Sequence, residues 1–136
     1  MYVYRLVTLL EKHPTVIIIG ETGCGKSTQI PQFIYEHELH SDMMIAITQP
    51  RRLAATSLAQ RVAFEMDCKV GTTVGYSIRF DEKSSESTKI IFLTEGMLLR
   101  EALSGKQYVP INWEGFYFIA FLKSISQSSN TKIQRT

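Results

Sequence analysis

The residues best suited to chemistry lie in one short glycine-rich segment near the start of the chain. It matches the pattern G-x-x-x-x-G-K-[S/T] in full, with Gly20, Glu21, Thr22, Gly23, Cys24, Gly25, Lys26 and Ser27. Glycines let the backbone curve around a phosphate so that successive N–H groups point inward, at the positive end of a following helix. The lysine ammonium would reach the outer phosphates, and the serine hydroxyl would bind Mg²⁺. The segment therefore predicts a nucleoside triphosphate site.

The sequence on both sides of this segment fits a phosphate-binding turn. Residues 15–19 form a compact β-branched run of the kind that is buried on both faces of a parallel sheet, and residues 26–38 have a helical pattern. A glycine-rich turn without a ligand is the plain alternative, and the flanking strand and helix disfavour it. The segment thus indicates a P-loop protein without naming its class.

Other residues narrow the class of P-loop protein. A GTPase needs an N-K-x-D sequence to bind guanine, and the chain has none. An ABC-type ATPase is suggested by L-S-G-K-Q at residues 103–107, which resembles the L-S-G-G-Q signature of that class. Lys106 replaces a glycine there, however, and no aspartate follows the next apolar run. Neither class is therefore expected.

Strand patterns and helix patterns alternate along the chain. Besides residues 26–38, the predicted helices cover residues 2–12, 53–66 and 95–103. Besides residues 15–19, the predicted strands cover residues 43–48, 74–80 and 89–93, with a polar loop at 81–88. This alternation predicts an α/β domain with a mostly parallel sheet. In open sheets of this kind ligands bind at the carboxyl ends of the strands, which is where residues 20–27 and Arg51 fall.

Composition and charge exclude several broad classes of protein. The chain has 136 residues, 44% hydrophobic and 21% charged, as expected for one ordinary globular domain. The net charge of +2 is too small to indicate nucleic acid binding, so only local clusters can do so. Cys24 and Cys68 fit a reducing compartment better than a disulfide framework. Because no apolar run approaches the roughly 20 residues of a membrane span and no signal peptide is recognisable, we expect an intracellular protein without a membrane partner.

Four longer motifs, taken in their order along the chain, resemble the DEAH-box RNA helicases. They are T-Q-I-P-Q at residues 28–32, T-Q-P-R-R at 48–52, V-G-Y-S-I-R-F-D-E at 74–82 and T-E-G-M-L-L-R-E at 94–101. The resemblance covers about residues 12–103 and implies a partial RecA-like domain of the P-loop NTPase class. The expected division is an incomplete first RecA-like helicase domain at residues 1–103 and a tail at 104–136 that matches nothing in the family and is partly disordered.

The resemblance implies nucleotide-binding roles for the glycine-rich segment and for one arginine outside it. Residues 20–27 together with Thr28 would hold the phosphates of ATP or another NTP, with Ser27 as the Mg²⁺ ligand. Arg61 would stack on the base. Because stacking recognises a π-face, it accepts several bases, so broad NTP use is implied.

The resemblance also implies RNA as a partner. Arg51 and Arg52 would grip the RNA backbone, with Thr94 and Arg79 contacting phosphates further along the strand. Such contacts position a nucleic acid without reading its sequence. Further partners implied by the family are a helicase activator protein or a ribonucleoprotein complex, as in mRNA splicing or ribosome assembly. We therefore expect a location in the nucleus rather than the cytoplasm.

Two departures from the family pattern bear on catalysis. Glu95 stands where the family usually has aspartate, and the D-E-A-H carboxylates that should follow are absent, the only D-E pair being Asp81 and Glu82. The S-A-T motif and the second RecA-like domain are missing too. Because an acidic pair orients Mg²⁺ and water, and an arginine finger is worth about 10³ to 10⁵ in rate, no complete catalytic set is present. The expected function is therefore that of an NTP-dependent RNA helicase by family, here as a fragment, and the alternative is an inactive nucleotide- and RNA-binding truncation product.

Overall fold

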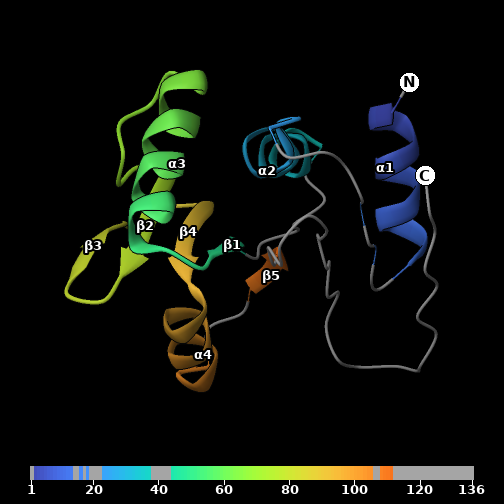
Figure 1. Ribbon diagram of the computed structural model, residues 1–136. Coiled ribbons are helices and arrows are strands. Elements are labelled where there is room, and N and C mark those ends of the chain that lie inside the picture. The colour runs from blue at the N-terminus through green and yellow to red at the C-terminus, as the bar shows by residue number, and fades with distance from the viewer. Residues whose placement is uncertain are drawn as a thin grey trace.

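Helices and strands alternate along the part of the chain that the computed structural model describes, which is residues 2–13, 16, 18, 23–37, 44–105 and 108–111 (Figure 1). The helices are α1 (Tyr2–Lys12), α2 (Lys26–Glu36), α3 (Arg52–Glu65) and α4 (Glu95–Leu103). The strands are β1 (Met44–Gln49), β2 (Val74–Ile78), β3 (Asp81–Lys83), β4 (Ile90–Thr94) and β5 (Tyr108–Ile111). These bounds agree with the predicted helices and with the predicted strands at 43–48, 74–80 and 89–93.

The described strands form a single sheet in the order β3-β2-β4-β1-β5. Strand β4 pairs in parallel with β1 on one side and β2 on the other, and β5 pairs in parallel with β1. Only β3 runs antiparallel, against β2 at one edge. The sheet is therefore mostly parallel, as predicted, and the carboxyl ends of β1, β2, β4 and β5 all point to the same edge.

Strand β4 is buried on both of its faces. Ile90 and Phe92 belong to the main hydrophobic core, to which α2 and α3 also contribute. Ile91 and Leu93 form a second cluster, against which Met97 of α4 packs. Figure 1 accordingly has α2 and α3 on one side of the sheet and α4 on the other. An unbroken apolar run is what such double burial requires, which explains why this strand was predictable.

Helix α3 lies close against the sheet because the side chains between them are small. Its buried residues are Ala55, Ala59, Val62 and Ala63. The helix packs on β1, β2 and β4, so it covers the centre of the sheet. No described helix has the length and apolar character needed to cross a lipid bilayer.

The polar loop predicted at residues 81–88 is wrong in its first part, because residues 81–83 form β3. A two-residue turn reverses the chain after β2, and Phe80 in this turn has a φ of 68°. The phenol of Tyr76 donates a hydrogen bond to Asp81 across the pair at 2.9 Å. Strand β3 was missed because its three residues are all exposed and lack the apolar alternation by which strands are recognised.

A strand also lies within the segment that the sequence assigned to a tail. Residues 108–111 form β5, whose Pro110 stands opposite Ala46 of β1. Proline has no N–H to donate, so it argues against a central strand and is tolerated at the edge of a sheet. Residues 112–136, for which disorder was predicted in part, lie outside the described residues. So does the strand predicted at 15–19, apart from Val16 and Ile18, whose side chains join the main core.

A close approach of two backbones disfavours any side chain at Gly75 in β2. A Cβ at this position would clash with the carbonyl oxygen of Lys83 and lie 3.3 Å from the Cα of Ser84. We expect Gly75→Ala to lower the free energy of unfolding by about 1–3 kcal/mol, because backbone atoms must move to admit the methyl group. Urea denaturation followed by circular dichroism measures this change.

The matched control is Gly96→Ala in α4, where an added Cβ has nothing within 4 Å. Alanine favours the helix over glycine by up to about 1 kcal/mol, so this variant should be as stable as the wild type or more stable. Equal unfolding midpoints for Gly75→Ala and the wild type would contradict the close approach of β2 to the chain at residues 83–84.

Candidate nucleotide site and RNA-facing edge

The described part of the glycine-rich segment has the backbone shape of a phosphate cradle. Gly23 and Gly25 have φ angles of 82° and 87°, in the left-handed region that favours glycine. A Cβ on Gly25 would lie 3.2 Å from Cγ of Gln29, so a larger residue is disfavoured there by space as well. Gly25 is the N-cap of α2 and supplies no side-chain cap, so the amino end of the helix stays open to an anion. Gly20, Glu21 and Thr22 lie outside the described residues.

Side chains add a cation and hydroxyl groups to this backbone shape. Lys26 Nζ donates to Cys24 Sγ at 3.4 Å, and the Thr28 hydroxyl donates to the Gly25 carbonyl at 3.2 Å. Lys26 and Ser27 form the first turn of α2, where the helix dipole also favours negative charge. Backbone donors, an ammonium group and a hydroxyl together fit a triphosphate with Mg²⁺, since Mg²⁺ takes one or two protein ligands and completes its shell with phosphate oxygens and water.

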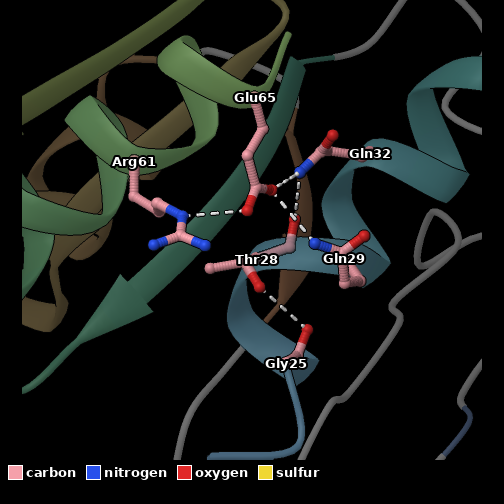
Figure 2. Close-up of polar contacts among 6 residues, drawn as sticks. All are labelled: Gly25, Thr28, Gln29, Gln32, Arg61 and Glu65. Carbon is pink, nitrogen blue, oxygen red and sulfur yellow. Dashed lines mark hydrogen bonds and ion pairs between the residues drawn. The ribbon is translucent and has the colours of Figure 1, made fainter.

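A carboxylate that the sequence analysis did not single out joins the two helices beside this segment. Glu65, the last residue of α3, accepts a hydrogen bond on Oε1 from Nε of Arg61 at 2.9 Å (Figure 2). Its Oε2 accepts from the side-chain amides of Gln32 at 2.6 Å and Gln29 at 3.0 Å, both on α2. The amide of Gln32 also donates to the carbonyl of Thr28 at 2.9 Å. We call Gln29, Gln32, Arg61 and Glu65 the interhelix network.

The charge of Glu65 is stabilised within the interhelix network. Hydrogen bonds from Arg61 and then from Gln32 hold the pKa of this carboxyl below its ordinary value, against the opposing effect of burial. A signal for half of the network was present in the sequence, because Arg61 and Glu65 are spaced four residues apart on a helix. No local signal connects them to Gln29 and Gln32.

The carboxyl ends of three neighbouring strands are level with one another. Gln49, the last residue of β1, stands opposite Thr94, the last residue of β4. Ser77 of β2 stands opposite Leu93 of β4, so β2 ends at the same height. Adjacent strands are about 4.8 Å apart, so these three ends span about 10 Å of the sheet edge.

The structure brings the four predicted RNA contacts to this one edge. Arg51 and Arg52 follow β1 and are exposed, Arg79 follows β2 and is exposed, and Thr94 lies between them at the end of β4. Helices α3 and α4 also begin here, directly after β1 and β4, so their positive ends add to the arginine charges. This edge suits a chain of phosphates.

The turn after β2 carries an exposed aromatic ring beside one of these arginines. The guanidinium carbon of Arg79 lies 4.9 Å from the centre of the Phe80 ring. Phe80 is 90% exposed and has a left-handed backbone, which is uncommon for a bulky residue. Arg79 could be singled out from the sequence and the neighbouring ring could not, since a lone exposed phenylalanine has no distinguishing pattern.

The Asp81–Glu82 pair lies far across the sheet from the phosphate-binding end of α2. Both residues belong to β3 at one edge, whereas α2 packs on β1 and α3. The two carboxylates already accept hydrogen bonds, from Tyr76 at 2.9 Å and from Ser84 at 2.6 Å. Their position is unsuited to holding a metal ion at the glycine-rich segment.

No family model matches this chain. Several curated proteins are similar to it. The chain is 53% identical over 101 residues to a probable ATP-dependent RNA helicase DHX35 homolog of Caenorhabditis elegans, which covers 74% of this chain and 14% of that protein. It is 53% identical over 100 residues to ATP-dependent RNA helicase DHX33 of Homo sapiens, with the same two shares. It is also 53% identical over 100 residues to the pre-mRNA-splicing factor ATP-dependent RNA helicase DEAH10 of Arabidopsis thaliana, covering 73% of this chain and 14% of that protein.

The chain thus spans about 14% of the length of these curated relatives. Identity of about half of the residues over roughly three quarters of the chain is homology, and it confirms the resemblance inferred from the motifs. The relatives imply a RecA-like domain, with which the mostly parallel sheet and its flanking helices agree. Over this segment of about 100 residues, the chain is homologous to DEAH-box ATP-dependent RNA helicases.

Proposed function

We propose that this chain is the nucleotide-binding and RNA-binding part of an ATP-dependent RNA helicase. ATP, or another NTP, binds with Mg²⁺ at the P-loop formed by residues 20–27 and Thr28. The observation that carries this proposal is the open amino end of α2, which is preceded by a left-handed Gly25 and begins with Lys26 and Ser27. This arrangement provides backbone donors, an ammonium group and a metal ligand for a triphosphate.

Arg61 binds the base of the nucleotide by stacking. Its side chain is 67% exposed, so a face of the guanidinium is accessible to a ring. The hydrogen bond to Glu65 holds it on the side of α3 that meets α2. A π-face is common to all bases, so ATP and GTP both fit this contact.

Single-stranded RNA binds along the carboxyl edge of β1, β4 and β2. The exposed Arg51, Arg52 and Arg79 and the hydroxyl of Thr94 supply its phosphate contacts. The names of the curated relatives, all RNA helicases and one a pre-mRNA-splicing factor, support RNA as the ligand. The setting that we propose is a ribonucleoprotein complex with a helicase activator protein. A nuclear location follows from that setting.

Nucleotide binding without turnover is the second function that a specific observation favours. The 136 residues contain no D-E-A-H sequence, and the one Asp-Glu pair lies in β3, away from α2. Phosphate binding depends on backbone N–H groups, Lys26 and Ser27, which are all present. Hydrolysis further needs carboxylates to hold the metal and orient water, so this chain alone binds NTP without consuming it.

Lys26→Ala tests the P-loop. The ammonium is the main positive charge facing the outer phosphates, and a lost charge-assisted hydrogen bond is worth about 1.5–3 kcal/mol, so the affinity for ATP should fall by at least about tenfold. Isothermal titration with ATP and with GTP, in the presence of Mg²⁺, measures this change. The two nucleotides should bind the wild type with affinities within about threefold of each other, because stacking discriminates poorly between bases.

The matched control for this experiment is Lys69→Ala. Lys69 is exposed and precedes β2, at the opposite edge of the sheet. Its removal should leave the affinity unchanged. Undiminished ATP binding by Lys26→Ala would refute the P-loop assignment, and a tenfold preference for one base would refute stacking by Arg61.

Replacing Arg51 and Arg52 by alanine tests the RNA-facing edge. Binding to single-stranded RNA of any sequence should weaken to the same degree, and the log–log slope of affinity against salt should flatten by about one to two units. Fluorescence anisotropy with two labelled RNAs of unrelated sequence, over a range of salt concentrations, gives both quantities.

A charge-matched control removes two cations from the other edge, with Lys69→Ala and Lys89→Ala together. Lys89 precedes β4 as Lys69 precedes β2. This control should retain the wild-type slope. If RNA affinity instead survives the loss of both arginines and disappears when residues 104–136 are deleted, the arginine pair is not the binding site.

Phosphate release by the purified chain tests whether it turns over nucleotide. We expect no release above the Lys26→Ala background, with or without RNA, because the 136 residues hold no D-E-A-H sequence to position the metal and the attacking water. A chain extended by the D-E-A-H region and second domain of a relative is the positive control and should release phosphate. RNA-stimulated release by the 136-residue chain that is lost in Lys26→Ala would contradict this expectation.

A further inference from the structure

The interhelix network divides the two oxygens of one carboxylate between two helices. Oε1 of Glu65 is engaged by Arg61 on α3, and Oε2 is engaged by both glutamines of α2. Moving Glu65 would therefore disturb Arg61 and α2 together. A plain surface ion pair four residues apart on one helix would not have this property, since it contacts nothing beyond its own helix.

The contact to Arg61 orients the guanidinium plane without covering its faces, because the N–H bonds of this group lie in the plane. The bond is made by Nε, at the stem of the group, while the side chain stays 67% exposed. An arginine side chain carries about 2 kcal/mol of rotamer entropy, part of which is lost when it stacks on a ring. Holding the stem beforehand reduces that loss and leaves a face of the plane accessible to a base.

The contacts to α2 extend to the phosphate-binding segment itself. Gln32 is only 8% exposed, so its amide needs partners, and it finds them in Glu65 and in the carbonyl of Thr28. Gln29 donates to Glu65, and its Cγ lies directly beside the position where a Cβ on Gly25 would stand. A continuous set of contacts therefore runs from the glycine-rich segment through the glutamines and Glu65 to Arg61 (Figure 2).

We propose that Glu65 is a positioning residue for nucleotide binding, which holds Arg61 at a set place relative to the phosphate cradle so that one nucleotide meets both. The proposal rests on the proposed nucleotide site and adds to it the residue that relates the base contact to the phosphate contact. Glu65 itself touches neither base nor phosphate. Its effect is transmitted through Arg61 on one side and through Gln29 and Gln32 on the other.

The experiment compares ATP with inorganic tripolyphosphate, which has the phosphates and lacks the base. Wild-type protein should bind ATP more tightly than tripolyphosphate in the presence of Mg²⁺. Glu65→Ala should reduce this ratio of affinities by about three- to tenfold, the range expected for a cation–π contact, with little change for tripolyphosphate. Arg61→Ala should reduce the ratio equally, and the double variant should reduce it no further, because both changes remove the same contact.

The conservative variant Glu65→Gln separates positioning from general damage to the fold. Its amide oxygen can still accept from Arg61 Nε, so the ratio should lie between those of the wild type and Glu65→Ala. The control Glu36→Ala removes an exposed carboxylate at the end of α2 and should leave the ratio unchanged. Equal losses of ATP and tripolyphosphate binding in Glu65→Ala would mean that Glu65 only supports the packing of α2 on α3, and would overturn the proposal.

A second readout requires no nucleotide. The Nε–H proton of Arg61 should give an NMR signal protected from exchange with water in the wild type and in Glu65→Gln, and lost in Glu65→Ala.

The stability that Glu65 adds should also depend on pH. Because the pKa of Glu65 is lowered on folding, this stability is complete above the ordinary value of about 4.3 and is lost as the pH falls through the lowered value. Arg61 is its charged neighbour on α3, and Gln29 and Gln32 of α2 do not titrate, so the difference in stability between wild type and Glu65→Gln should shrink between about pH 6 and pH 3.

The outcomes separate this proposal from the proposed function. If Lys26→Ala leaves both affinities at their wild-type values, the phosphate cradle is misassigned and the nucleotide site falls. If Lys26→Ala removes binding of both ligands while Glu65→Ala keeps the wild-type ratio, or if the effects of Glu65→Ala and Arg61→Ala add, the nucleotide site stands and the positioning role is refuted.

Discussion

The parallel pairing of β1 and β2 with the central strand β4 is the constraint on which the rest of the structure depends. Because the three strands run in the same direction and end level with one another, every segment that leaves them emerges at one edge of the sheet. Helices α3 and α4 begin there and cover opposite faces, which buries β4 on both sides. The same pairing that forms the core thus gathers arginines from separate motifs beside positive helix ends.

Buried elements of the fold could be predicted from the sequence, and the edge strands could not. Strand β4 and helix α3 have continuous or periodic apolar residues, because both are packed against the core, and their positions were predicted closely. Strand β3 is exposed along its length and β5 contains Pro110, so neither has the pattern by which a strand is recognised. These two edge strands depend on pairing with β2 and β1, which no local pattern encodes.

In the candidate site, too, some contacts could be predicted from the sequence and others could not. The turn before α2 was predictable because its glycines are identified by their type and spacing, and Gly23 and Gly25 do take left-handed conformations. The interhelix network was not predictable in full, since Glu65 meets Gln32 and Gln29 across 33 and 36 residues of sequence. Only packing of α2 on α3 brings these residues together. Until that packing is known, nothing distinguishes these two glutamines from other polar residues of a helix.

Binding of a nucleotide and its hydrolysis depend on groups from different parts of a fold. Binding a triphosphate needs donors that one turn and one helix end provide, and α2 with its preceding glycines supplies them locally. Hydrolysis needs charge placed on both sides of the transferred phosphoryl group, by groups that come from other strands and from another domain. The one Asp-Glu pair of this chain lies in β3, which β2 and β4 separate from β1, and its carboxylates are engaged with Tyr76 and Ser84. The described residues therefore place the donors for binding on α2 and its preceding turn, away from the Asp-Glu pair of β3.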